Sequence, residues 1–161
     1  MTSNTRLSAI QVILLAGLVA GTMDITAACL NAWIQSGVTP DRVFRYIATG
    51  VLGPPALTAG AGTAALGLFL HYVIATGWAV VFYIVSRFLG LMTEHPIPVG
   101  LGYGVVVYLL MNFVIVPLSQ VPARRPPPQF HERAIQAGIL MICIGVPIAL
   151  IVRRFGRPSS A

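Results

Sequence analysis

The chain has 161 residues, of which 57% are hydrophobic and 9% are charged. A soluble globular domain carries about 25% charged residues, so this composition nearly excludes a soluble enzyme. It also excludes disorder over most of the chain, because disordered segments are poor in apolar residues. The length corresponds to one domain or, in a membrane protein, to about four spans of roughly 20 residues with their connections.

The formal net charge of +6 comes from ten arginines, with no lysine, set against four acidic residues. A basic chain can indicate nucleic-acid binding. Here, however, the arginines stand singly or in pairs at the ends of apolar runs, and no basic stripe with interleaved aromatic residues is present. Such flanking arginines are typical of contact with anionic lipid headgroups. We therefore expect the lipid bilayer, and no nucleic acid, as the partner.

Four long apolar runs cover most of the sequence, over about residues 7–33, 58–91, 97–118 and 134–152. Only helices and closed barrels cross a hydrocarbon core, and barrel strands alternate apolar and polar residues, whereas these runs are continuous. The sequence therefore predicts an all-α fold: an integral membrane four-helix bundle in which residues 1–161 form a single transmembrane domain. A cleaved signal peptide is the alternative for the first run, but the run is too long and Asp24 interrupts it.

A short helix is predicted over about residues 40–52, between the first two spans. Thr39 supplies a capping hydroxyl, Pro40 fits the first helical position, and Asp41 is an acid in the first turn. Apolar side chains recur on one face, while Arg42 and Arg45 lie on another. This pattern predicts a helix in the membrane interface with its arginines toward lipid phosphate. The alternative is a re-entrant segment that packs back into the bundle.

The later connections and the chain ends are polar. Residues 120–130 contain three consecutive prolines and are predicted to be extended, and residues 156–161 are predicted to be a disordered tail. Arg153 and Arg154 follow the fourth span and are expected at lipid headgroups. Four spans place both termini on one side. The arginine count is equal on the two sides, but the N-terminal amine and the arginines after the fourth span favour the cytoplasm for the termini.

Ionisable groups inside a membrane span are costly and indicate function by default. Asp24 in the first span and His71 in the second are such groups. Counting residues from the span midpoints, at 1.5 Å per residue, places both toward the same side of the membrane. Asn112 in the third span and Gln136 in the fourth are displaced in the same direction. These four residues are the candidates for a proton or solute path.

Small residues flank these polar positions at helical spacing. Gly17 and Gly21 precede Asp24, Gly67 precedes His71, and Gly104 precedes Asn112. Small residues let helix backbones approach closely. We therefore expect these four glycines to form the helix contacts and the polar side chains to face the bundle.

Two interpretations of this polar centre remain open. An Asp–His pair that gains and loses a proton could gate or couple the movement of a small solute. The same groups could instead satisfy one another as a clamp that fixes helix register, so that the protein is a structural or accessory subunit. Signatures of hydrolases are absent, and the two cysteines suggest neither a disulfide framework nor a zinc site. We predict no catalytic residues, cofactor or metal; haem ligation by the single span histidine is a weaker alternative.

Several runs resemble a group of small bacterial inner-membrane proteins and, more distantly, the YagU-type family. They are residues 17–24 (GLVAGTMD), 48–53 (ATGVLG) and 65–72 (ALGLFLHY), with shorter matches at 102–104, 111–112 and 117–119. The resemblance extends over roughly residues 10–120. It implies the four-helix fold and a multi-pass protein of the bacterial cytoplasmic membrane, and it transfers no activity. We expect the chain to form homo-oligomers.

Overall fold

The computed structural model describes residues 7–123 and 127–156. Within them the chain is helical and contains no strand, which confirms the predicted all-α fold. Four helical segments are long and apolar enough to cross a membrane: Ala9–Ser36, Ala61–Phe88, Pro96–Leu118 and Phe130–Phe155. Residues 124–126 of the proline-rich connection and residues 157–161 of the predicted tail lie outside the described residues.

Two of the spans are single helices and two are interrupted. The first and second are α1 (Ala9–Ser36) and α3 (Ala61–Phe88). The third consists of α5 (Pro96–Leu110), the π-helical turn η2 (Met111–Ile115) and α6 (Val116–Leu118). The fourth consists of α7 (Phe130–Ile139), the π-helical turn η3 (Leu140–Gly145) and α8 (Val146–Phe155). Shorter elements connect the spans: α2 (Pro40–Leu52), the 3₁₀ helix η1 (Pro54–Thr58) and α4 (Leu91–Glu94).

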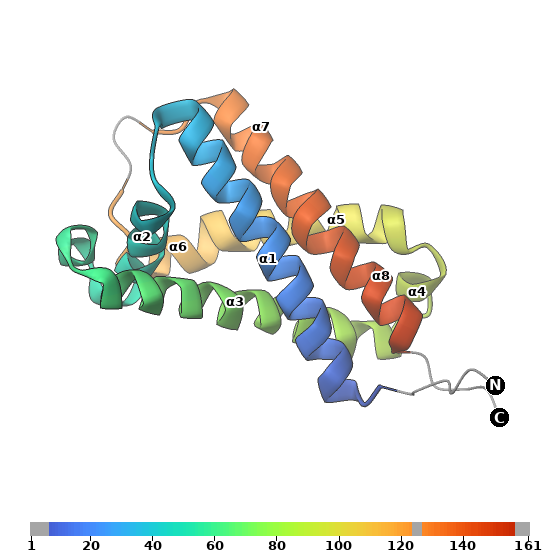
Figure 1. Cartoon of the computed structure of the whole chain (residues 1–161). Coiled ribbons are helices and arrows are strands. Elements are labelled where there is room, and N and C mark those ends of the chain that lie inside the picture. Colours follow the sequence, from blue (N-terminus) through green and yellow to red (C-terminus); the bar gives the residue numbers. More distant parts are fainter. Residues whose placement is uncertain (1–6, 124–126, 157–161) are drawn as a thin grey trace.

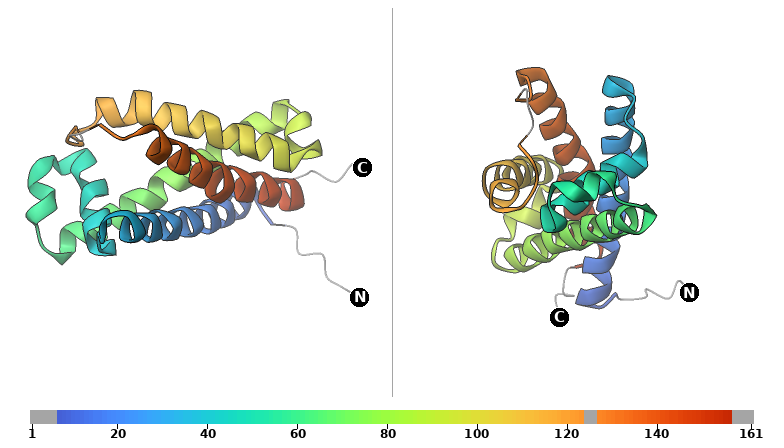
Figure 2. Two further views of the ribbon diagram at one scale, coloured as in Figure 1. Left: turned by 90° about the horizontal axis from the view of Figure 1, so that it is seen from above. Right: turned by 90° about the vertical axis from the view of Figure 1, so that its left-hand side faces the viewer.

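The spans run alternately up and down, so α1 begins and α8 ends at the same end of the bundle (Figure 1). We call this the termini end; α4 lies there too, between α3 and α5. The opposite end, the α2 end, holds α2, η1, α6 and the start of α7. Seen from that side, α2 lies among the ends of α1, α3, α6 and α7 (Figure 2).

The buried core lies in the half of the bundle near the termini end. Its largest fully buried side chains include Val12 of α1, Phe82 of α3 and Ile148 of α8. Tyr103 of α5 reaches α3, where its hydroxyl donates a hydrogen bond to the Trp78 carbonyl oxygen at 2.7 Å. Its ring also stands edge-on to that of Phe82, with 5.0 Å between centroids. This half is therefore packed across all four spans.

The α2 helix begins at the predicted residues but not by the predicted cap. Pro40 occupies the first helical position, yet the Thr39 side chain makes no capping hydrogen bond. The Thr39 hydroxyl instead interacts with the Asp41 carboxylate and, together with Arg45, holds the pKa of Asp41 below its usual value. Thr39 thus occupies the position before the helix, as predicted, but the predicted side-chain cap is not made.

One face of α2 is packed against the bundle. Ala48 and Thr49 are fully buried, and the backbone at Phe44 approaches Gly67 of α3 so closely that a Cβ there would overlap the Phe44 carbonyl. At its C-terminal end, the Val51 carbonyl accepts a hydrogen bond of 2.8 Å from the Gln120 side chain, just after α6. The second and third spans are thus joined through α2 at this end.

Each interrupted span has its π-helical turn one residue before a proline. The turn in the third span precedes Pro117, and the turn in the fourth precedes Pro147. In both, the residue before the proline donates its N–H five residues back: Val116 to Met111, and Val146 to Met141. A π turn accommodates one extra residue in the helix. Side chains before and after the turn are therefore offset around the helix axis.

In each of the two interrupted spans, the proline also leaves one backbone carbonyl without an N–H donor from its own helix. The Val116 N–H is used by Met111, and Pro117 has no N–H. The Asn112 carbonyl therefore has no donor four or five residues ahead of it. The same argument applies to the Ile142 carbonyl in the fourth span. Unpaired backbone inside a membrane is tolerated where it is buried in protein or faces water.

Candidate functional site

The structure brings Asp24 of α1 and His71 of α3 together. The Oδ2 atom of Asp24 lies 4.0 Å from the Nε2 atom of His71, and the two side chains are 15% and 12% exposed, respectively. This separation is too long for a hydrogen bond, so the two side chains face each other without one. Among the described residues, the Asp24 carboxylate accepts no hydrogen bond. An ionised carboxylate inside a membrane span normally pairs with another group or faces water.

His71 is held by the backbone of α1. Its Nε2 atom lies 2.9 Å from the Gly21 carbonyl oxygen. A carbonyl oxygen only accepts hydrogen bonds, so Nε2 carries the proton and donates it. The two helices come close enough for this hydrogen bond because Gly21 has no side chain. The Tyr72 ring and the Ala75 methyl group of α3 approach α1 at that point. In that tautomer Nδ1 is the ring atom with an acceptor lone pair.

The pair lies at the boundary between the packed and the less packed halves of the bundle. Ala20 of α1 and Ala75 of α3 both belong to the buried core. Asp24 and His71 each lie one helical turn beyond these alanines, toward the α2 end. The pair therefore has a sealed core on one side and the α2 end of the bundle on the other.

The structure does not join the other two path candidates to this pair. Asn112 donates its side-chain amide to the Tyr108 carbonyl of its own helix, at 2.9 Å. Gln136 is exposed on α7. Within residues 7–123 and 127–156, no hydrogen bond or ion pair connects either of them to Asp24 or His71.

The four predicted packing glycines all lie at close contacts between helices, with different partners. Gly17 faces Thr76 of α3 and Gly21 faces Tyr72, whereas Gly67 faces α2 and Gly104 faces the backbone of Met141 in η3. Thr22 adds a contact between α1 and α3, because its hydroxyl lies 3.0 Å from that of Tyr72.

A second glycine contact between the third and fourth spans was not predicted. A Cβ on Gly145 would overlap the Gly100 carbonyl oxygen, and a Cβ on Gly100 would lie 2.8 Å from the Gly145 carbonyl oxygen. Gly100 and Gly104 are four residues apart, and this GxxxG spacing is the sequence signal that could have identified the contact.

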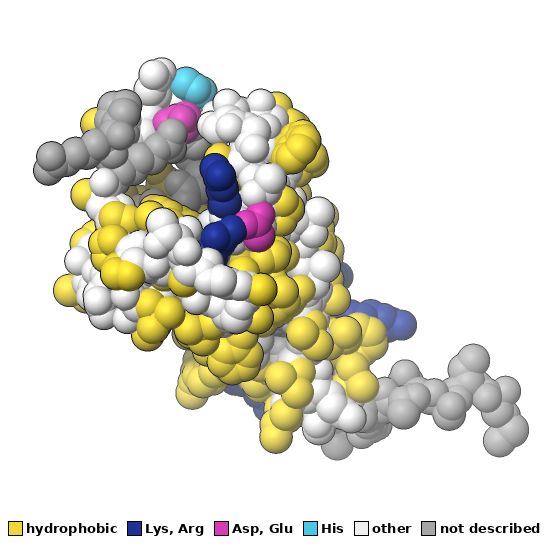
Figure 3. Space-filling view, turned by 60° about the vertical axis from the view of Figure 1, so that its left-hand side comes forward, with side chains coloured by type: hydrophobic (Ala, Val, Ile, Leu, Met, Phe, Trp, Pro, Cys, Tyr) yellow, Lys and Arg dark blue, Asp and Glu magenta, His cyan; other side chains and the backbone are white. Residues whose placement is uncertain are grey.

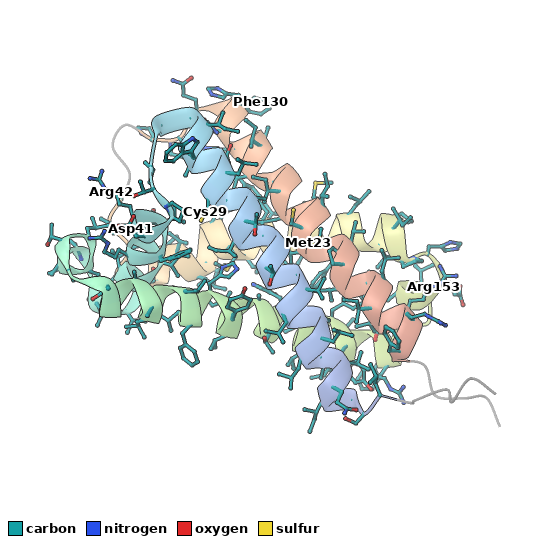
Figure 4. The ribbon with its side chains drawn as sticks, in the orientation of Figure 1. Met23, Cys29, Asp41, Arg42, Phe130 and Arg153 are labelled. Carbon is teal, nitrogen blue, oxygen red and sulfur yellow. The ribbon has the colours of Figure 1, made fainter. Side chains whose placement is uncertain are left out.

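The arginines predicted at lipid headgroups lie at the two ends of the molecule. Figure 4 shows Arg42 beside Asp41 at the α2 end and Arg153 at the end of α8. Arg154 is also exposed in the last turn of α8. Arg45, by contrast, forms an ion pair with Asp41. The chain thus presents positive charge at both ends of its apolar helices.

In the described part of the chain, no three His, Cys, Asp or Glu side chains lie close enough together to hold a metal ion. Cys29 and Cys143 are both free thiols. Comparison of the chain with protein-family models, with characterised proteins and with solved structures gave no match.

Proposed function

We propose that this integral membrane protein provides a proton-linked path for a small solute, with Asp24 and His71 as the proton-exchanging pair. The main support is the position of the Asp24 carboxylate, which lies within a span at 4.0 Å from His71 Nε2. The Asp24 side chain is 15% exposed. A carboxylate in this position is costly unless it is paired or reached by water. Its partial exposure supports proton exchange with water.

The pair offers more than one protonation state. His71 keeps its Nε2 proton on the Gly21 carbonyl and takes up a second proton at Nδ1, while Asp24 binds or releases one on its carboxylate. Each transfer changes the charge of a site with few polar neighbours, where electrostatic interactions are strong. Such a change in charge alters both the hydration of the site and the attraction between α1 and α3. This is the physical basis for linking a proton to the passage of a solute.

The second candidate function is that of a structural or accessory subunit whose polar centre fixes helix packing. Two contacts favour it: the His71 bond to the Gly21 carbonyl and the Thr22–Tyr72 hydroxyl pair. Both join α1 to α3, and interhelical hydrogen bonds in membranes contribute about 0.6 kcal/mol on average. In this case Asp24 has one stable protonation state and exchanges no proton during function.

Proton flux into sealed proteoliposomes, followed with an internal pH dye, tests the proposal. Wild type is compared with Asp24→Asn and with Asp41→Asn, a matched control on α2. We expect flux above that of protein-free vesicles, lost in Asp24→Asn and retained in Asp41→Asn. Thermal unfolding in detergent checks that each variant folds. Equal flux in all three proteins would contradict the proposal. Absence of flux together with a less stable Asp24→Asn variant would favour the packing role.

The location and assembly are part of the same proposal. We place the protein in a bacterial cytoplasmic membrane, with both termini in the cytoplasm, as a homo-oligomer without a nucleic-acid partner. The resemblance to the YagU-type family supports the membrane assignment. Labelling of a cysteine introduced at Ser36 or at Gly156, from the outside of spheroplasts, tests the orientation. Ser36 ends α1 and Gly156 follows α8, so the two positions lie at opposite ends of the bundle.

A further inference from the structure

The α2 helix and the η1 segment border an open surface cavity of about 540 Å³ at the α2 end of the molecule. Its lining residues are Arg42 and Arg45 of α2 and Leu57 and Thr58 of η1. Figure 3 shows basic and acidic side chains close together on this end, with hydrophobic side chains over the adjoining surface. The cavity therefore combines a charged wall with an apolar one.

Arg45 is fixed in the wall of this cavity. Its Nη1 atom donates to the Ala59 carbonyl at 3.0 Å, and its Nε atom donates to the Asp41 carbonyl at 3.3 Å. Its Nη2 atom also bonds to the Asp41 carboxylate. The side chain is 22% exposed. Arg45 thus connects α2 to the chain after η1, and its charge is balanced by Asp41.

Arg42 has no such balance. It is exposed, and no ion pair or side-chain hydrogen bond of its own exists among the described residues. With Asp41 compensating Arg45, the cavity carries one unbalanced positive charge. The Thr58 hydroxyl adds a polar group to the wall and donates to the Pro55 carbonyl at 3.3 Å. An unbalanced guanidinium beside a fixed one is a favourable arrangement for a phosphate group, which accepts hydrogen bonds from both.

Leu57 favours a lipid over a free anion as the occupant of the cavity. It lines the cavity and is 41% exposed, so an occupant with an apolar part would bury surface that a free phosphate leaves in water. The cavity also lies at the end of a bundle of membrane-spanning length, where lipid headgroups are found.

We propose that this cavity binds the phosphate group of one anionic phospholipid per chain. Arg42 supplies the unbalanced charge, Arg45 is the second, prepositioned donor, and Leu57 contacts the apolar part of the lipid. A free phosphate ion offers the same chemistry to the arginines and is the other source that the test must separate. The inference is independent of proton exchange at Asp24.

Native mass spectrometry of the full chain in a neutral detergent tests this site. The probes are phosphatidylglycerol and phosphatidylcholine, and the proteins are wild type, Arg42→Gln and Arg87→Gln. Arg87 is a matched control because it is also an exposed arginine, in the last turn of α3 at the other end of the molecule. We expect wild type to retain one phosphatidylglycerol in preference to phosphatidylcholine. Arg42→Gln should weaken this binding roughly tenfold, as expected for the loss of one charge-assisted contact, and Arg87→Gln should not.

Equal weakening in the two variants would overturn the proposal, because the attraction would then depend on net charge alone. Retention of the lipid by Arg42→Gln at wild-type strength would also overturn it. Inorganic phosphate is the third probe: if phosphate binds and phosphatidylglycerol shows no preference over phosphatidylcholine, the site takes a free anion and the lipid assignment is wrong. Circular dichroism verifies folding, and Arg42→Lys, which keeps the charge, should preserve the preference for phosphatidylglycerol.

Discussion

Replacing Gly67 with alanine is expected to push α2 away from α3. The new Cβ would overlap the Phe44 carbonyl oxygen and would lie 2.6 Å from its carbonyl carbon and 3.2 Å from the Ala48 nitrogen. These are backbone atoms, which cannot rotate aside as a flexible side chain does. Overpacking costs about 1–3 kcal/mol, and alanine regains about 1 kcal/mol through its better helix propensity. Because the obstacle is backbone, we expect a net loss of about 2 kcal/mol.

Gly77→Ala is the matched control for this prediction. Gly77 lies on the same helix, and a Cβ added to it would meet no other atom within 4 Å. This variant should be as stable as wild type or up to about 1 kcal/mol more stable. Unfolding in mixed micelles with increasing dodecyl sulfate, followed by circular dichroism, measures all three proteins. Equal stability of Gly67→Ala and Gly77→Ala would refute the docking of α2 on α3.

Three further contacts are tested by the same unfolding measurement. Tyr103→Phe removes the buried hydrogen bond to Trp78 and should lose about 0.6–1.7 kcal/mol; an unchanged midpoint would contradict the cross-link between α3 and α5. Gly145→Ala should destabilise strongly, whereas Gly138→Ala, which meets nothing within 4 Å, should not. Thr39 and Arg45 lower the pKa of Asp41 in the folded protein. The ionised Asp41 carboxylate therefore stabilises the fold fully above the unfolded pKa, near 3.8, and this stabilisation is lost as pH falls through the lower folded pKa. Asp41→Asn should therefore be less sensitive to acid in that window, and an identical pH profile would be evidence against the interaction.

The fold could be predicted because its signals are long and continuous. Four long apolar runs without the alternation of barrel strands leave the helix as the way to satisfy the backbone in a membrane. The short α2 helix was marked by local chemistry, with Pro40 at a position that only a helix start accepts readily. The Thr39 side-chain cap was mispredicted because a capping hydroxyl must accept a hydrogen bond from a backbone N–H. The sequence does not say how this side chain turns when its hydroxyl can also donate to the Asp41 carboxylate.

The candidate site could be predicted only in part, and the third span contains one reason. Asp24 and His71 lie on uninterrupted helices, so a spacing of 3.6 residues per turn places them on the same faces as their neighbouring small residues. The stripe from Gly104 to Asn112 assumes the same spacing, but η2 begins at Met111 and adds a residue. A proline such as Pro117 predicts an interruption without saying whether it becomes a kink, a helix end or a π turn. That outcome depends on the neighbouring helices.

The uneven packing of the two halves has a consequence for how the protein meets its bilayer. The packed half contains the Tyr103 hydrogen bond and the buried side chains around Phe82 and Ile148. It cannot shorten or spread without opening cavities in this core. The opposite half depends largely on the contacts of α2. A mismatch between span length and bilayer thickness costs fractions of a kcal/mol per Å. The half of the bundle that deforms most easily will accommodate this mismatch. We therefore expect changes in membrane thickness or lateral pressure to deform the leaflet side around α2, and to reach Asp24 and His71 from that side alone.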